Sequence, residues 1–128
     1  MKGLLLVAHG SRRAESNDEV RQLAHQLEAS AGEKFDLVAS AFLELADPSI
    51  PVGLRAMIRA GVGEVTVMPY FLSAGRHVVT DIPGEVNIVR AESPEVEITL
   101  APYLGASPEV VDILLGLSSG SGKPADSS

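Results

Sequence analysis

The sequence predicts an α/β protein, a flavodoxin-like three-layer sandwich in which helices cover both faces of a four-stranded parallel sheet. Two patterns and their order lead to this fold. Short apolar runs typical of buried strands lie at residues 2–8, 35–43, 63–69 and 96–101. Segments with helical spacing follow them, at 15–31, 49–60, about 77–91 and 107–117. Strands that alternate with helices form parallel sheets covered on both faces, so the βαβαβαβα order predicts this architecture.

The helices are identified by apolar residues that recur every three or four positions. In the first helix this stripe consists of Val20, Leu23, Ala24 and Leu27. Gly32 and Gly61 mark the ends of the first two helices. In the third helix, Pro83 is compatible only with the first turn. Ser107 and Pro108 provide a cap and a first-turn proline for the last helix.

The length and composition fit one globular domain. The chain has 128 residues, of which 45% are hydrophobic and 21% are charged. No linker or internal repeat divides it. We therefore expect one domain over residues 1–117, followed by a Gly/Ser-rich and disordered tail over 118–128.

The composition also excludes several functional classes. The chain has no cysteine, which excludes disulfides, thiolate metal sites and cysteine nucleophiles. It has no apolar run long enough for a signal peptide or a membrane span, so we expect a cytoplasmic protein. A net charge of −7 and 4% aromatic residues argue against nucleic acid as a partner. The phosphate-binding motifs GxxxxGK[ST] and GxGxxG are absent.

Three residues that can bind a metal ion each follow a predicted strand. His9 follows the first strand, Glu44 the second and His77 the third. Ligands of open α/β sheets bind beyond the carboxyl ends of the strands. We therefore expect these three side chains to meet at one edge of the sheet.

Each of these residues also has a purely structural interpretation. His9 can hydrogen-bond its loop, His77 can lie at the surface near a helix start, and Glu44 can be a solvated carboxylate. Asp81 either supports His77 or is a first-turn acid favoured by the helix dipole. His25, within a mostly polar helix face, is expected at the surface.

Two imidazoles and a carboxylate make a suitable site for a divalent ion. Imidazole binds zinc, copper, iron and nickel, and cobalt lies between iron and nickel in affinity. Open coordination positions would let a substrate take the metal, and an imidazole or Glu44 can accept protons. Arg12, Arg13 and Arg76 stand beside the histidines, where they can receive ligand carboxylates. Their alternative interpretation is as ordinary exposed arginines at helix starts.

With these motifs in view, the chain resembles the small, single-domain class II chelatases, the CbiX-type sirohydrochlorin cobaltochelatases and related enzymes. The matching segments are LLLVAHGSR at 4–12, AFLELADPSI at 41–50 and GVGEVTVMPYFLSAGRHVVTDIP at 61–83. The third is the most specific, because it combines Pro-x-Phe-Leu-x-x-Gly-x-His with an Asp-Ile-Pro that begins six residues after the glycine. The resemblance covers roughly residues 2–117.

The resemblance implies a function for each part of this edge. It makes His9 and His77 the metal-binding and catalytic residues and places Glu44 at the family's acidic position. The substrates would be a divalent metal ion and a sirohydrochlorin-type tetrapyrrole, with no further cofactor. We assign substrate contacts to a wider set, namely Ser11, Arg12, Arg13, Arg76, Phe71 and Leu72. Buried core is the competing interpretation for at least one of the apolar residues at 70–72.

The resemblance further implies cobalt as the metal, with iron and nickel as alternatives, and a homodimer, because larger members hold two such halves in one chain. A rival of another class is a phosphohistidine carrier domain of a sugar-transport system, which would explain His9 but not His77. A third interpretation is a metal or tetrapyrrole carrier without turnover.

Overall fold

The computed structural model describes residues 1–121 of the chain. The last part of the predicted tail, 122–128, lies outside the described residues. The strands are β1 (Lys2–Ala8), β2 (Leu37–Phe42), β3 (Glu64–Pro69) and β4 (Glu97–Leu100). The helices are α1 (Ala14–Ala31), α2 (Ile50–Arg59), α3 (Ile82–Glu92) and α4 (Glu109–Gly116). Shorter helical turns are η1 (His77–Asp81), η2 (Leu104–Ala106) and η3 (Leu117–Ser121). The eight predicted elements are therefore present in the predicted order.

The four strands form one parallel sheet in the order β2-β1-β3-β4, which confirms the predicted fold class. The connections run outward in opposite directions from β1 and β3. This reversal of strand order creates the crevice in which open α/β sheets bind ligands. The chain continues from β1 into His9, so the first predicted site residue lies at that crevice.

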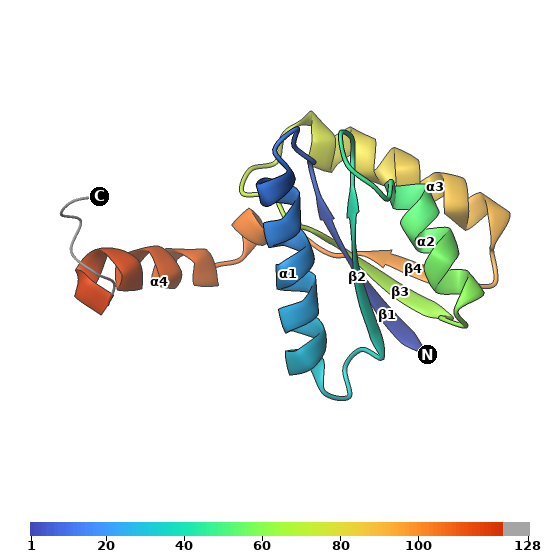
Figure 1. The fold of residues 1–128 in the computed structure, drawn as a ribbon, viewed down its shortest axis with the longest axis horizontal. Coiled ribbons are helices and arrows are strands. Elements are labelled where there is room, and N and C mark those ends of the chain that lie inside the picture. The colour runs from blue at the N-terminus through green and yellow to red at the C-terminus, as the bar shows by residue number, and fades with distance from the viewer. Residues whose placement is uncertain (122–128) are drawn as a thin grey trace.

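Helices lie on both faces of the sheet (Figure 1), and an apolar cluster lies between the sheet and each helical layer. Alternate residues of the strands, among them Leu5, Val7 and Val67, pack with α2 and α3 in the larger cluster. The opposite face, including Leu4 and Leu6, packs against α1 in the smaller cluster. This alternation follows from the strand geometry, in which successive side chains point to opposite faces. The sheet thus has a helical layer on both faces, as predicted.

The last helix differs from what its place in the alternation suggests. α4 runs away from the body of the molecule rather than back along the sheet (Figure 1). None of its residues is buried. The predicted tail starts at Ser118, and residues 117–121 form the turn η3, whose backbone leaves helical geometry at Ser119 and Gly120. No described helix is long and apolar enough to cross a membrane.

Candidate metal and substrate site

The turn after β1 places His9 beside Glu44. Gly10 has φ = 97°, a conformation that side chains rarely adopt, and a Cβ at this position would lie 1.7 Å from the carbonyl oxygen of Glu44. The pairing of β1 with β2 continues into this region, where the Glu44 N–H donates to the His9 carbonyl at 3.0 Å. The backbone therefore fixes both site residues before their side chains interact.

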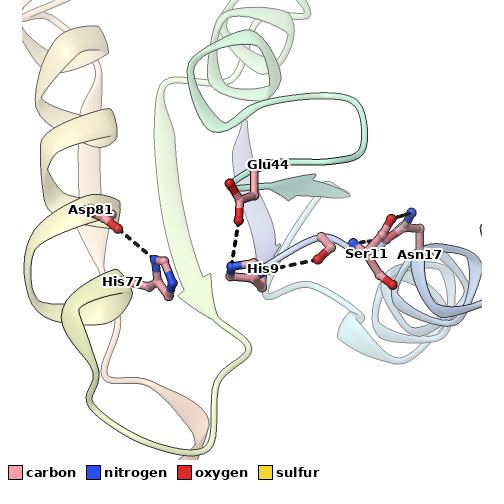
Figure 2. Close-up of polar contacts among 7 residues, drawn as sticks. His9, Ser11, Asn17, Glu44, His77 and Asp81 are labelled. Carbon is pink, nitrogen blue, oxygen red and sulfur yellow. Dashed lines mark hydrogen bonds and ion pairs between the residues drawn. The ribbon is translucent and has the colours of Figure 1, made fainter. Parts of the chain in front are cut away.

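A buried asparagine holds the next residue of the same turn. The Ser11 N–H donates to Asn17 Oδ1 at 3.0 Å, and Asn17 Nδ2 donates to the Ser11 carbonyl at 2.8 Å. Asn17 is 7% exposed, so these bonds satisfy groups that have little access to water. Together they fasten the turn to the first part of α1 (Figure 2).

The hydrogen bonds of His9 leave one ring nitrogen facing a carboxylate. Nδ1 lies 2.9 Å from the Gly10 carbonyl, which can only accept, so Nδ1 carries the proton. Nε2 lies 3.1 Å from Glu44 Oε2. In the neutral ring Nε2 carries a lone pair, as does the Glu44 carboxylate oxygen. Two lone pairs at this distance require a proton or a cation between them. Two donors each about 2.1 Å from one ion, at a right angle, stand about 3.0 Å apart, so the pair suits a shared metal ion.

His77 is oriented from the opposite side. It begins η1, a wide π turn in which the Ile82 N–H donates to the His77 carbonyl, and such turns are frequent at functional sites. His77 Nδ1 lies 2.7 Å from Asp81 Oδ2. The carboxylate accepts the Nδ1 proton, which leaves the Nε2 lone pair available to a metal. This contact favours the interpretation of Asp81 as a partner that supports His77 over its interpretation as a first-turn acid.

The two imidazoles face each other across the edge of the sheet (Figure 2), with ring centroids 4.7 Å apart and planes inclined at 69°. The side chains of His9 and His77 are 40% and 41% exposed, so an incoming ion can reach them. A hollow of about 360 Å³ lies on the His77 side, lined by Leu43, Glu44, His77, Thr80, Asp81, Gly84 and Glu85. Among the described residues, however, no three acidic or histidine side chains are gathered closely enough to hold a metal. The set consists instead of two facing pairs, His9 with Glu44 and His77 with Asp81.

The predicted substrate contacts have different surroundings. Arg12, Arg13 and Arg76 are exposed, as carboxylate-binding side chains at a rim should be. The Ser11 hydroxyl accepts from the Arg13 N–H at 3.0 Å and so shapes the turn. His25 is exposed on α1, as predicted.

The two apolar candidates also differ from each other. Phe71 packs against the larger core cluster, which supports the core interpretation for that residue, whereas Leu72 is 74% exposed. Leu72, Tyr70, Phe71 and Leu104 line a separate hollow of about 280 Å³. Leu72 therefore remains available for contact with a ligand.

One supporting residue, Asn17, was missed in the sequence. The spacing contained a signal for it, because Asn17 lies three positions before Val20 and so falls on the apolar stripe of α1. A polar residue on a buried stripe must find a partner inside the protein. The identity of that partner, Ser11, depends on the fold and cannot be predicted from the local sequence.

The fold places the chain among the flavodoxin-like α/β proteins, and its sequence identifies the family. A model of the CbiX family matches residues 3–118. Since this is most of the chain, the protein belongs to the CbiX family, which confirms the predicted resemblance.

Known proteins similar to this chain include the sirohydrochlorin cobaltochelatase of Methanococcus maripaludis, 30% identical over 145 residues, with 94% of this chain and 99% of that protein covered. The chloroplastic sirohydrochlorin ferrochelatase of Arabidopsis thaliana is 32% identical over 112 residues, covering 88% of this chain and 49% of that protein. The sirohydrochlorin chelatase SirB from Bacillus subtilis subspecies spizizenii, solved in complex with cobalt, superposes with a TM-score of 0.81 at 26% identity, covering 92% of this chain and 50% of that one. The chain thus spans about half the length of the last two proteins.

Proposed function

We propose that this protein is a sirohydrochlorin chelatase, which inserts a divalent metal ion into a sirohydrochlorin-type tetrapyrrole. The observation that carries the proposal is the pair of facing imidazoles at the carboxyl edge of the sheet, His9 and His77. Each ring has a proton acceptor on Nδ1, which leaves its Nε2 for a metal, and the Nε2 of His9 also faces Glu44. Membership of the CbiX family and the names of the relatives support the same reaction.

The geometry suits a metal that must be delivered rather than kept. Imidazole and carboxylate ligands bind divalent ions without the tight hold of a thiolate cage. Insertion of a divalent ion releases two protons from the pyrrole nitrogens of the substrate. Glu44 Oε2 and a histidine Nε2, both free once the metal leaves, are the acceptors at hand. Metal and protons would therefore exchange places at the same side chains.

The tetrapyrrole would be held from the rim. Its carboxylates carry negative charge, and this chain has a net charge of −7, so binding requires a local positive patch. Arg12, Arg13 and Arg76, exposed beside the two histidines, supply that charge. The exposed Leu72 offers an apolar contact for the macrocycle.

We propose cobalt as the metal, with iron and nickel as the alternatives. Relatives at about 30% identity are named for cobalt and for iron, and the donor set accepts each of these ions. Insertion by purified protein, followed by the absorbance of sirohydrochlorin with Co²⁺, Fe²⁺ or Ni²⁺, ranks the three. The substrate is kept in excess, because a carrier without turnover would stop after one equivalent. Failure with all three ions would overturn the proposal.

The sharpest test replaces His77 with alanine. We expect His77→Ala to lower the insertion rate by about 10²-fold or more, because it removes a metal ligand and a proton acceptor together. His25→Ala is the matched control, since His25 is an exposed histidine on α1 outside the site. A His77→Ala rate close to that of the control would contradict the assignment.

A further inference from the structure

The segment that follows β4 reaches the same edge of the sheet as the site residues. The Ala101 N–H donates to the Val67 carbonyl at 2.9 Å, which extends the pairing of β4 with β3. In the same way the Tyr70 N–H donates to the Val7 carbonyl at 2.8 Å, two residues before His9. The metal-binding candidates described above follow the first three strands. The fourth strand therefore ends beside the site without an assigned part in it.

Gly105 of η2 holds this segment against the loop that carries Leu72. The Gly105 N–H donates to the Phe71 carbonyl at 3.0 Å. A Cβ at position 105 would lie 1.9 Å from the Leu72 carbonyl oxygen and 2.9 Å from the Leu72 Cα. These are backbone atoms, which cannot turn aside as the end of a flexible side chain can. The close approach of two backbone segments therefore requires glycine at this position.

An apolar hollow lies where the two segments meet. It measures about 280 Å³, and its lining comes from the loop after β3 and from η2, namely Tyr70, Phe71, Leu72 and Leu104. The Leu104 residue is half-buried, so part of its surface is open to the hollow. The same loop continues through the exposed Arg76 to His77. An apolar wall and a cationic side chain thus stand on one short stretch of chain that ends at a metal-binding candidate.

The loop between Leu72 and His77 is attached near its two ends by different contacts. In the described part of the chain, residues 72–74 make no backbone hydrogen bond. The Gly105 contact holds the start of the loop, whereas η1 and the contact with Asp81 hold His77 at its end. Loss of the Gly105 contact should therefore free Leu72 and leave the histidine in place.

We propose that η2 is part of the tetrapyrrole site: Gly105 is a positioning residue that holds Leu72, and Leu104 completes the apolar wall that receives the macrocycle. This inference rests on the proposed function, which supplies the occupant. An apolar macrocycle that carries carboxylates matches an apolar hollow on the loop that also bears Arg76. The metal is bound by the two histidines without help from η2. Changes in η2 should therefore weaken tetrapyrrole binding and spare metal binding.

The first test separates the two substrates. Gly105→Ala should raise the Kd for metal-free sirohydrochlorin by about 10-fold or more, because the displaced loop must then be ordered on binding. The Kd for Co²⁺, measured by titration calorimetry, should stay near that of the wild type. Gly63→Ala, at an exposed glycine before β3 where a Cβ meets no atom within 4 Å, is the matched control. Equal losses of affinity for both ligands in Gly105→Ala would show general damage to the fold and would overturn the proposal.

The second test does not depend on how well Gly105→Ala folds. Leu104→Ala removes the apolar side chain without introducing a clash, and it should raise the Kd for sirohydrochlorin by about 5- to 10-fold. In the insertion assay this change should raise the KM for sirohydrochlorin more than it lowers kcat. Ile88→Ala, a truncation at a 45% exposed residue of α3, should change neither quantity.

The outcomes also distinguish this inference from the proposed function. Wild-type affinity for sirohydrochlorin in Leu104→Ala would overturn the inference and leave the chelatase proposal intact. A wild-type chain that binds no sirohydrochlorin would instead contradict the proposed function, and the inference would fall with it.

Discussion

His9 and His77 face each other, but the chain holds them by different means. His9 stands directly after a buried strand, in a turn fastened by the conformation of Gly10 and by the side chain of Asn17. His77 follows a stretch of exposed residues, 72–76, and is placed by the start of a helix. The His9 side of the site is therefore built mainly from backbone, and the His77 side from a helical turn with its Asp81 contact.

The carboxylates differ in the same way. Glu44 approaches Nε2 of His9, the nitrogen proposed to bind the metal, whereas Asp81 approaches Nδ1 of His77, the nitrogen not proposed to bind it. Glu44 is thus placed to share a metal or a proton, and Asp81 to orient its ring. Substitutions on the His9 side should therefore act mainly by moving the site residues, and substitutions at Asp81 mainly by changing the charge beside His77.

The largest effect is expected at Gly10. Gly10→Ala must both strain the backbone at φ = 97° and push against the carbonyl of Glu44. We expect a loss of about 2–4 kcal/mol in the free energy of unfolding. We also expect an insertion rate lowered by about 10²-fold, because His9 and Glu44 move apart. Chemical denaturation and the absorbance assay measure the two effects.

The control for this change is Gly84→Ala. Gly84 borders the same hollow on the His77 side, and a Cβ there meets no atom within 4 Å. Gly84→Ala should therefore retain near wild-type stability. Equal losses of stability in the two variants would show that the turn after β1 is not specially constrained.

On the His77 side, charge should matter more than position. Asp81→Asn keeps an oxygen that can accept the Nδ1 proton but removes the negative charge that makes Nε2 a better ligand. We expect Co²⁺ affinity, measured by titration calorimetry, to fall by about 10- to 100-fold while the thermal midpoint changes little. Glu19→Gln, at an exposed acidic residue of α1 outside the site, is the matched acidic control. If Asp81→Asn left the Co²⁺ affinity unchanged, Asp81 would be only an acidic residue favoured in the first turn of the helix, without a role in supporting His77.

How far the sequence predicts this site follows from the same contrast. Apolar runs locate the strands, and the rule that ligands bind at their carboxyl ends brings His9, Glu44 and His77 to one edge. The clamp between Asn17 and Ser11 depends on how α1 lies against the turn, which no local pattern encodes. The direction of α4 could not be predicted either, because helical periodicity does not say which surface a helix packs on.

A smaller effect on the rate is expected at Asn17, on the His9 side. Asn17→Ala leaves the Ser11 N–H and carbonyl without their partners in a half-buried turn. We expect a loss of about 2 kcal/mol in the free energy of unfolding and only a several-fold lower insertion rate, since Gly10 still sets the turn. Gln22→Ala, an exposed amide on the same helix, should change neither quantity. If Asn17→Ala lowered the insertion rate more than Gly10→Ala, the asparagine would matter more than the glycine for the position of His9.

The smallest effect is expected at the far end of the helix that follows His77. Arg55 of α2 binds Glu92 of α3 with two contacts of 2.9 and 2.7 Å. The hydrogen bond from Arg55 lowers the pKa of Glu92 below 4.5. A lowered pKa means that the folded state binds the proton less well than the unfolded state. The stabilisation is therefore fully present above pH 4.5 and is lost as the pH falls through the folded pKa. Glu92→Gln should slightly lower the thermal midpoint at pH 7, and this difference should shrink as the pH falls below 4.5, with the insertion rate at pH 7 unaffected. A rate that falls with this distant pair would show that the position of His77 depends on the anchoring of the whole helix and not only on the turn at Asp81.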